Sequence, residues 1–555
     1  MKRIRTRKFL TFMLTSLAFL LSMIINAHAG YVTPELRATL MTLGPDRDIP
    51  VIITLTDTVD LTSFTDSDKG LRRSKIIKAL QEKSDTAQRP LTAFLRNRGI
   101  SRYVSLWIIN GLSATVPADM INAIANFPGV ESVALDYSIQ APAVTYGTTA
   151  SPQWNIVTVK APDLWNLGYD GTGVVVAGMD TGVDINHPDL QSRWRGGADS
   201  WYDPNGQHAA PYDASGHGTQ TMGIMVGGNA GGTSIGIAPA AKWIAVKIFN
   251  DQGAASLSVI HQGFQWLLDP DHNPDTDDAP DVVNNSWGLD SVNGCSSEFQ
   301  ADIQALKASN IAVVFADGNY GPYPSTSISP ANNTISYATG ATDSLNNIAY
   351  FSSRGPSVCD GSIYPEIVAP GVNVRTADLT EGGMSPNSYA TVSGTSFAAP
   401  HVSGIMALLI DAFPGIPVQD LELALGISAT DLGTPGADNS YGYGLVNGLS
   451  AYNYLFTTIP MNDPPVALND NARTSRNKPV TINVVANDYD VDGTVVASSI
   501  AIISMPAKGI VINNYNGTVK YTPNKNFKGT DSFTYTVRDD NGAVSNVATV
   551  KVTVK

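Results

Sequence analysis

The most informative stretch of this chain is SGTSFAAPH at residues 393–401, a serine with small neighbours at the predicted start of a helix. Two shorter segments precede it, MDTGVD at 179–184 and SGHGTQTMG at 215–223. Together the three supply a carboxylate, an imidazole and a hydroxyl in the order Asp, His, Ser, one of the few orders in which activated serine nucleophiles are assembled. Each segment alone reads as a turn, a loop or a helix cap, but the combination predicts a catalytic triad.

The three side chains have complementary chemistry. A neutral serine is a weak nucleophile, so Ser396 needs a base within hydrogen-bonding reach. His217 titrates near neutrality and can take that proton, while Asp180 can hold the imidazole in the correct tautomer. Because Ser396 opens a predicted helix, its hydroxyl lies near the positive end of a helix dipole.

Around these segments, from about residue 150 to 455, apolar strands alternate with helices, which predicts an α/β doubly wound parallel sheet. In such sheets ligands bind beyond the carboxyl ends of the strands, and Asp180 directly follows one strand. The apolar strand-like runs lie at 173–179, 243–249, 282–284 and 311–316, and predicted helices at 256–268 and 298–309.

Residues 48–139 show the order β-α-β-β-α-β, which predicts a ferredoxin-like α+β module. Its first helix is expected at 74–97, interrupted or kinked by Pro90. Asn110-Gly111 is expected to form the turn between its two central strands.

Beyond a linker at 461–465 the pattern becomes all-β and predicts a sandwich module. Asn516-Gly517 marks a hairpin turn. Strands rich in Val, Thr and Tyr are expected at 479–485, 509–513, 517–522, 532–538 and 546–554.

Length, charge and the N-terminus limit the function classes. A chain of 555 residues should hold several domains, and a net charge of −14 makes nucleic acid a poor partner. Basic residues precede an apolar run at 9–25 and the sequence Ala27-His28-Ala29, which predicts a secretory signal peptide over 1–29. The alternative is that this segment is not cleaved and remains as a membrane anchor. We expect an exported protein without a membrane span in its mature form, since no later stretch approaches a spanning length of uninterrupted apolar residues.

Cys295 and Cys359 are the two cysteines of the sequence. In an exported protein an even pair predicts one disulfide. Two free buried thiols are the alternative. A zinc site is disfavoured because no histidine lies close by in sequence.

Residues 150–455 resemble a subtilisin-like serine protease. The resemblance covers the triad segments and also GIAPAAKWIAVKIF at 236–249 and IVAPGV at 367–372. It implies an endopeptidase that forms an acyl-enzyme on serine and needs no cofactor for its chemistry, with proteins or peptides as substrates. Because VVFADGN at 313–319 resembles the family strand that ends in the oxyanion-hole asparagine, it also implies that role for Asn319, with a simple turn residue as the alternative.

The same resemblance implies a set of substrate-binding residues. Segment 286–288 resembles the lining of the primary specificity pocket, which pairs with an extended substrate. The orientations of Trp287 and Asp317 cannot be read from the sequence, so only a broad, apolar preference is expected. The implied residues are Ser286, Trp287, Gly288, Ala316, Asp317 and Gly318.

The N-terminal module resembles the family's propeptide, an intramolecular inhibitor and folding assistant. Its end, DYSIQ at 136–140, is then expected to lie in the active site like a product, with autocleavage within 137–150. A permanent regulatory domain is the alternative. The expected boundaries are a signal peptide at 1–29, a propeptide at 30–145, a catalytic domain at 146–457, a linker at 458–464 and a β-sandwich at 465–555.

Calcium is common in this family, so structural calcium is an open expectation. The glycine-rich loop 227–236 lacks carboxylates for a tight site. In the tail, Asp488, Asp490 and Asp492 alternate in a loop that resembles the acidic loop of bacterial cadherin-like or immunoglobulin-like repeats. A solvated turn is the alternative interpretation, because the loop lacks the glutamate of an EF-hand. A cell surface or extracellular matrix is the expected partner of such a tail.

Two competing functions remain. One is a catalytically silent adhesion protein that acts through its tail, against which the intact triad segments argue. The other is a serine esterase of the α/β-hydrolase class, which needs Asp and His after the serine. Only His401 follows Ser396, on the same predicted helix, and no Gly-x-Ser-x-Gly surrounds the serine.

Overall fold

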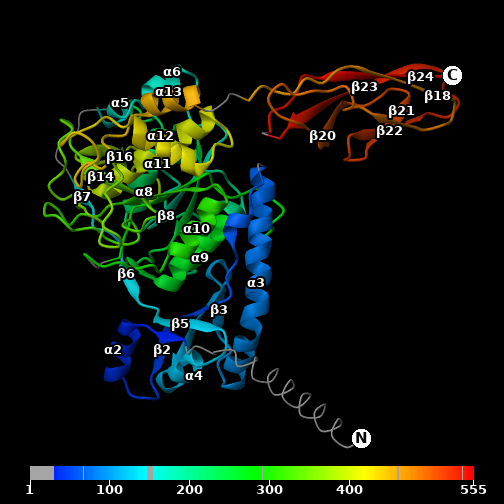
Figure 1. Cartoon of the computed structure of the whole chain (residues 1–555). Coiled ribbons are helices and arrows are strands. Elements are labelled where there is room, and N and C mark those ends of the chain that lie inside the picture. Colours follow the sequence, from blue (N-terminus) through cyan, green and yellow to red (C-terminus); the bar gives the residue numbers. More distant parts are fainter. Residues whose placement is uncertain (1–29, 67, 147–153, 290–291, 459–461, 541) are drawn as a thin grey trace, which may run out of the picture. The chain divides into compact units, whose positions relative to one another are not determined.

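The structure is a computed structural model that describes residues 30–555 apart from 67, 147–153, 290–291, 459–461 and 541 (Figure 1). The predicted signal peptide at 1–29 lies outside the described residues. The chain divides into two compact units, one holding most of residues 30–448 and the other residues 449–555 with two short segments. Each unit is described by itself.

The N-terminal module is a five-stranded sheet in the order β1-β5-β2-β4-β3 with helices packed on it. The β2–β4, β2–β5 and β3–β4 pairs are antiparallel. Its elements are β1 Tyr31–Val32, α2 Pro34–Thr42, β2 Asp48–Leu55, η1 Leu61–Ser63, α3 Lys69–Asn97, β3 Tyr103–Leu106, η2 Trp107–Ile109, β4 Gly111–Pro117, η3 Ala118–Met120, α4 Ile121–Ala125 and β5 Val130–Leu135.

Helix α3 is longer than the sequence predicts, and it continues through Pro90. The expected interruption is therefore wrong. Buried apolar residues of α3 stand on both sides of the proline, Ile76, Ile77 and Leu80 before it and Leu91 and Leu95 after it. Their packing outweighs the one backbone hydrogen bond that proline removes.

The central module is built on a seven-stranded sheet in which all neighbouring strands run parallel, as predicted. The order is β15-β14-β13-β12-β8-β10-β9. After β8 the chain first builds the β9 and β10 side and then crosses to β12, so the carboxyl end of β8 is the point where strand order reverses, which is where open α/β sheets bind ligands. The strands are β8 Val175–Asp180, β9 Trp201–Tyr202, β10 Lys242–Lys247, β12 Val282–Asn285, β13 Ala312–Ala316, β14 Tyr337–Thr342 and β15 Ile367–Pro370.

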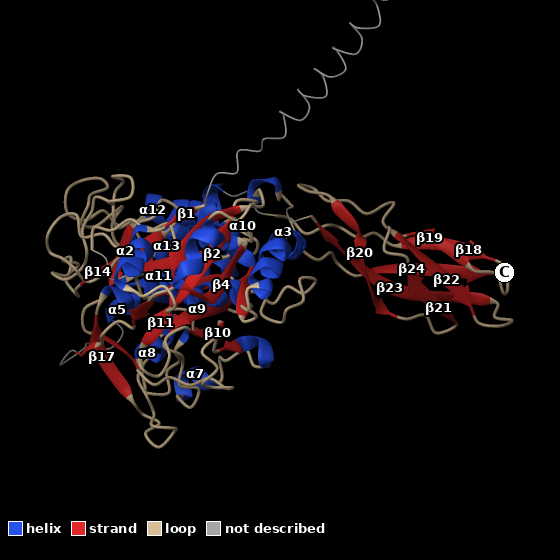
Figure 2. Cartoon of the chain, turned by 90° about the horizontal axis from the view of Figure 1, so that it is seen from below, coloured by secondary structure: helices blue, strands red, loops and turns tan. Residues whose placement is uncertain are grey.

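Helices pack against this sheet, and Figure 2 shows them mixed with its strands in the larger unit. Helix α11 is the one described helix long and apolar enough to cross a membrane, but 83% of it is buried inside the protein as a core helix. The helices of the larger unit are α5 Trp154–Thr158, α6 Ala161–Asn166, α7 Pro188–Gln191, η4 Ala198–Ser200, α8 His217–Val226, α9 Leu257–Leu268, α10 Gln300–Ala308, α11 Thr395–Ala412 and α12 Val418–Ser428. Helix α13, Gly448–Thr458, belongs to the second unit from Leu449 onward.

Two small sheets join segments that are distant in sequence. Strand β6 (Ser138–Gln140) pairs antiparallel with β11 (Ala254–Ser256). Strand β7 (Thr145–Tyr146) pairs with β17 (Tyr389–Ser393), which also pairs with β16 (Val374–Ala377). The sequence predicted neither β6 nor β7 as separate strands, because each is short and gains its hydrogen bonds from a distant partner.

The second unit contains two sheets around one apolar core, β18-β24-β23-β20 and β19-β22-β21. All five predicted strands are present, and the hairpin predicted at Asn516-Gly517 joins β21 to β22. The sequence analysis did not predict β18 and β20. Fewer of their residues are buried than in β23 and β24. The strands are β18 Asp470–Thr474, β19 Val480–Asn483, β20 Val495–Ser504, β21 Gly509–Asn513, β22 Thr518–Pro523, β23 Gly529–Asp539 and β24 Ala548–Val554.

Candidate active site

Asp180 and His217 meet at the carboxyl end of the central sheet. Asp180 is the last residue of β8 and His217 the first of α8, and both are buried. The His217 Nδ1 lies 2.8 Å from Asp180 Oδ1, which also accepts a hydrogen bond from the Thr181 amide. The carboxylate thus fixes the imidazole so that its Nε2 is the free nitrogen, and Nε2 has no hydrogen-bond partner among the described residues.

The pKa of His217 reflects this environment. Burial by itself lowers the pKa of His217, but the Asp180 carboxylate, which accepts its Nδ1 proton, and the more distant Asp213 raise it above its ordinary value. Asp213 also accepts hydrogen bonds from the amides of Ser215, Gly216 and Thr219, and so holds the turn that precedes α8.

Ser396 lies in the first turn of α11, which packs against α8. The ring of the next residue, Phe397, lies 5.5 Å from the His217 ring, measured between centroids. The Ser396 hydroxyl donates to the Ser286 carbonyl at 3.1 Å, and the Ser286 hydroxyl donates back to the Ser396 carbonyl at 2.7 Å. The start of α11 is therefore tied to the end of β12 beside the imidazole.

Asn319 is exposed beside this turn and is held by Thr395. Its Oδ1 accepts hydrogen bonds from the Thr395 amide at 2.9 Å and from the Thr395 hydroxyl at 3.2 Å. The oxygen of the side-chain amide is thus occupied, and its NH₂ group is left to donate. The sequence analysis missed Thr395, although it stands within the quoted segment 393–401.

Two of the residues expected to bind substrate have their side chains in the core, so only the backbone of these segments is left to face a substrate. The side chains of Trp287 and Asp317 are fully enclosed: Trp287 packs against Phe264, Phe299 and Phe315, and Asp317 accepts a hydrogen bond from Ser352. Burial raises the pKa of Asp317 well above its ordinary value. Both side chains therefore face the core, and neither gives the pocket bulk or charge.

Two glycines of this region, Gly288 and Gly318, lie against the side chain of Ile328. A Cβ on Gly288 or Gly318 would stand 2.4 or 2.9 Å from Ile328 Cδ1, and Gly318 has a φ of +102° that favours glycine. Ala316 ends β13 and is 4% exposed. The structure thus brings the backbones of segments 286–288 and 316–318 to the same neighbour, Ile328.

Lys247 is a second residue near the site that the sequence analysis missed. It is fully buried, lies in β10 opposite Asp180, and its Nζ donates to the carbonyls of Thr181 and Phe249. The sequence did contain a signal for this residue, a lysine inside the apolar run 243–249, because charged side chains are rarely buried without a specific set of partners.

His401 is buried, and both of its ring nitrogens have hydrogen-bond partners in the core. Its Nδ1 is 2.7 Å from the Phe397 carbonyl and its Nε2 is 2.9 Å from Asn155 Nδ2. Burial lowers the pKa of His401 to about 4, so it is neutral at pH 7. Both ring nitrogens are engaged within the core, which argues against the esterase arrangement.

Two family profiles and several known proteases are similar in sequence to this chain. A profile described as the subtilase family matches residues 171–444, and one described as a bacterial Ig domain matches residues 462–553. Subtilisin Savinase of Lederbergia lenta is 36% identical over 302 residues, which cover 54% of this chain and 98% of that protein. The chain belongs to the subtilase family.

Other members of this family extend the comparison. Bacillopeptidase F of Bacillus subtilis (strain 168) is 36% identical over 417 residues, which cover 68% of this chain but only 28% of that protein. Subtilisin E of the same strain is 32% identical over 344 residues, covering 61% of this chain and 80% of the relative. As a subtilase the chain is a hydrolase of the serine endopeptidase class, and its tail is a bacterial Ig-like β domain.

The disulfide predicted from the sequence is present in this subtilase. Cys295 and Cys359 are bonded, with their Cα atoms 5.0 Å apart and a sequence separation of 64. The alternatives of free thiols or a zinc site at these cysteines are therefore wrong.

The aspartates of the tail loop, Asp488 and Asp490, differ in the groups that surround their carboxylates. Both carboxylate oxygens of Asp490 are enclosed and have no hydrogen-bond partner among the described residues. Burial raises the pKa of Asp490, and nearby Asp492 and Asp539 add to that rise. Asp488 instead lies with its oxygens at the Tyr535 hydroxyl, 3.0 and 3.1 Å away.

Proposed function

We propose that this chain is an exported serine endopeptidase that hydrolyses peptide bonds through an acyl-enzyme on Ser396. His217 acts as general base and then as general acid, and Asp180 orients it and stabilises the imidazolium. The hydrogen bond between His217 Nδ1 and Asp180 Oδ1, beside the first turn of α11, is the observation that carries the proposal.

The first step needs a rotation of the Ser396 side chain. Its hydroxyl now donates to the Ser286 carbonyl, while His217 Nε2 is unpartnered. Rotation about the Cα–Cβ bond redirects the oxygen toward the ring without moving the backbone. Catalytic hydrogen bonds of this kind often form only in the substrate complex.

In acylation and in deacylation, His217 Nε2 first accepts a proton and then donates it. Ser396 Oγ attacks the scissile carbonyl as its proton passes to His217 Nε2, and the imidazolium then protonates the departing amine. Water then attacks the ester carbonyl as its proton passes to the same nitrogen, the bond to Ser396 Oγ breaks, and the imidazolium returns the proton to Ser396 Oγ, releasing the carboxylic acid product. The oxyanion of each tetrahedral intermediate is stabilised by the Asn319 NH₂ group and the Ser396 backbone N–H.

Substrate binding is assigned to the backbone of 286–288 and 316–318 around Ile328. The side chains of Trp287 and Asp317 are in the core, so a broad, apolar primary pocket fits the site better than an acidic one. An extended peptide can add as a strand along the edge of β11 and along the backbone of 286–288.

We assign the N-terminal module as a ferredoxin-like inhibitor propeptide spanning about 30–145. Its strand order, β5-β2-β4-β3, supports that fold. Strand β6, near the end of this span, pairs along β11 with Ile139 buried, as a product segment does. Asp136 accepts hydrogen bonds from the Ser258 amide and hydroxyl at the start of α9. Autocleavage is assigned to 137–150, part of which lies outside the described residues.

The tail at 465–555 is assigned a binding role at a cell surface or matrix, and structural calcium at Asp488, Asp490 and Asp492. The enclosed, unpartnered oxygens of Asp490 are the supporting observation. A silent adhesion protein is the competing function, and the formed His217–Asp180 pair disfavours it.

Digestion of casein by the wild type and by Ser396→Ala tests the function. We expect the wild type to digest casein and to lose the N-terminal module, and the variant to do neither. Equal inactivity of both, with the wild type folded and freed of its N-terminal module, would support the adhesion alternative.

A further inference from the structure

The side chain of Arg73, in helix α3, is enclosed by the central module and is only 1% exposed. Its guanidinium makes five hydrogen bonds, as many as it has N–H donors. Four of the acceptors are backbone carbonyls and the fifth is a carboxylate. They are Asp277 Oδ1 at 2.7 Å and the carbonyls of Ser309 at 2.8 Å, Pro280 at 2.9 Å, Ala279 at 3.3 Å and Asn310 at 3.5 Å. We call these five residues the guanidinium socket.

The secondary structure of the central module holds the socket carbonyls in place. The carbonyls of 279 and 280 stand just before β12, and those of 309 and 310 stand between α10 and β13. These strands are parallel neighbours, and the Ala312 amide donates to the Asp281 carbonyl at 2.9 Å where both begin. Since Ser309 caps the C-terminus of α10, the negative end of that helix dipole also favours a cation here. The socket is therefore shaped by the central module itself.

The two strands that begin at the socket end at the candidate active site. Strand β12 leads to Ser286, which is hydrogen-bonded to Ser396, and β13 leads to Asn319. The socket thus lies at the amino ends of these strands and the catalytic residues lie at their carboxyl ends. Between Pro280 and Ser286 an extended chain spans about 20 Å. A group bound in the socket therefore leaves the catalytic residues open to a substrate.

Arg73 stands on a face of α3 that packs on the central module. Three apolar residues of this face belong to the same buried cluster as Leu306 of α10, namely Ile76, Ile77 and Leu80. With Arg73 they have the spacing i, i+3, i+4 and i+7, which places all four on one side of a helix. The surface under α3 thus fits an amphipathic helix that carries an arginine.

An acidic loop at 269–278, DPDHNPDTDD, borders the socket and carries five aspartates. Asp277 of this loop is part of the socket, and Asp275 pairs with Lys78 of α3. Gln81 of α3 donates to Asp269 at 3.2 Å. The loop therefore complements the positive charge of a docked basic helix.

We propose that this surface is a docking site for an arginine on an amphipathic helix of a partner protein, separate from the catalytic centre. This use of the surface rests on the proposed function, because loss of the N-terminal module after autocleavage frees the socket. Arginine is selected over lysine because its planar group directs five donors to fixed acceptors, whereas an ammonium is a point charge with three donors. The partner helix therefore carries an arginine followed by apolar residues three, four and seven positions later.

Fluorescence anisotropy with the processed enzyme tests the docking site, after Ser396 has been blocked with a sulfonyl fluoride so that the probe is not cut. The probe is a labelled helix of alanine and glutamine that carries Arg, Ile, Ile and Leu at the spacing of residues 73, 76, 77 and 80. We expect this probe to bind, and lysine in place of its arginine to weaken binding about tenfold. Asp277→Asn in the enzyme should weaken binding of the arginine probe about fivefold. Asp343→Asn, which removes a carboxylate from a turn outside the socket, should leave it unchanged.

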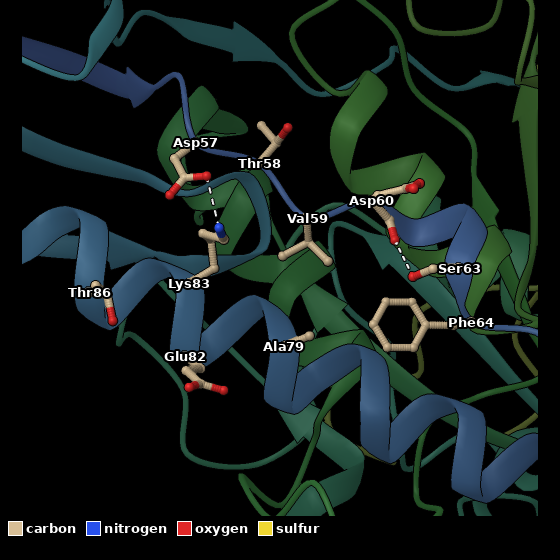
Figure 3. Close-up of a pocket in the computed structure, with 10 residues that line it drawn as sticks. All are labelled: Asp57, Thr58, Val59, Asp60, Ser63, Phe64, Ala79, Glu82, Lys83 and Thr86. Atoms are coloured by element: carbon tan, nitrogen blue, oxygen red, sulfur yellow. Dashed lines mark hydrogen bonds and ion pairs between the residues drawn. The ribbon is translucent and has the colours of Figure 1, made fainter. Parts of the chain in front are cut away.

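A second probe with the sequence of residues 69–84 supplies a matched control within α3. Lys83 stands on the same helix but pairs with Asp57 of its own module at 2.8 Å (Figure 3). Lys83→Ala in this peptide should leave its affinity unchanged, whereas Arg73→Lys should lower it about tenfold. No preference for arginine over lysine in either probe would overturn the docking site.

The socket is also tested in the unprocessed chain, so that its failure and the failure of the proposed function are separate results. In the Ser396→Ala background, which keeps α3 in place, Arg73→Ala leaves the five acceptors without their donors. Ethylguanidinium should raise the melting temperature of this variant more than ethylammonium does at the same concentration, and the two cations should act alike on the parent. Equal effects on the variant would overturn the socket. A wild type that keeps its N-terminal module would instead refute autocleavage, and the melting temperatures would still decide the socket.

Discussion

His217 and Asp180 are joined by a hydrogen bond of 2.8 Å between Nδ1 and Oδ1, although 37 residues separate them in sequence. Both side chains are buried, so the carboxylate acts on the imidazole with little screening by solvent. This pair sets the protonation behaviour of the site.

The pKa of His217 is raised, mainly by Asp180 acting against burial. The proposed base must be neutral, so kcat/KM should increase with pH through a pKa above about 6.5, the ordinary value of histidine. Asp180→Asn should shift that limb to lower pH and reduce kcat by about 10⁴. A pH profile of peptide hydrolysis checks both effects, and an unshifted limb in the variant would contradict this role for Asp180.

Asn319→Asp separates the two functions of the Asn319 side chain. The aspartate can still accept from Thr395 but cannot donate to an oxyanion. We expect kcat to fall by about 10²–10³ with little change in KM, the range known for the corresponding donor in a subtilisin. Thr395→Val, which removes only one of the bonds to Asn319, should lower kcat less. A larger effect on KM than on kcat would argue for substrate binding instead.

Asp136→Asn should loosen the contact between the N-terminal module and α9. The carboxylate receives two hydrogen bonds from Ser258, and bonds to a charged acceptor contribute about 1.5–3 kcal/mol. We expect the N-terminal module to dissociate about tenfold faster from the processed enzyme, measured as the appearance of peptidase activity. Asp119→Asn, in the same module, is the control and should leave the time course unchanged.

The disulfide closes a long loop in the unfolded chain. Replacing both Cys295 and Cys359 by serine should lower the free energy of unfolding by about 4 kcal/mol in the chain-entropy description. Urea denaturation on the Ser396→Ala background measures this loss. Reduction of the unsubstituted protein should produce a similar decrease, whereas the serine variant should not respond to reductant.

His261 is a buried cation in the core, with Nδ1 2.9 Å from Asp302 and Nε2 3.2 Å from Glu298. Burial lowers its pKa, but the two carboxylates outweigh burial and raise the pKa of His261 to about 10. Since the folded-state pKa exceeds the unfolded value, this stabilisation is complete below about pH 6.5 and is lost progressively up to pH 10.

His261→Gln should therefore lower the free energy of unfolding by about 3 kcal/mol at pH 6.5, because Asp302 loses its counter-charge. The difference from the parent should shrink by pH 9.5. His208→Gln removes a partly exposed pair with Asp251 and should change stability by less than about 1 kcal/mol. Chemical denaturation at the two pH values measures both variants.

Much of the fold followed from local patterns. Apolar runs at 173–179 and 311–316 predicted parallel strands that are present, and alternating residues at 532–538 predicted β23. Strands β6 and β7 and the unbroken course of α3 through Pro90 were missed. Their stability comes from partners far away in the chain, which local propensity does not contain.

The sequence alone determined the order of the reactive groups, the alternation of strands and helices, and the pairing of its two cysteines, because each depends on residue type and spacing. Only the tertiary structure decided that Trp287 and Asp317 turn into the core, that Thr395 holds Asn319, and that α3 lies across the acidic loop at 269–278. The direction of a side chain is set by packing and hydrogen bonds with neighbours that the fold, and not the local sequence, brings beside it.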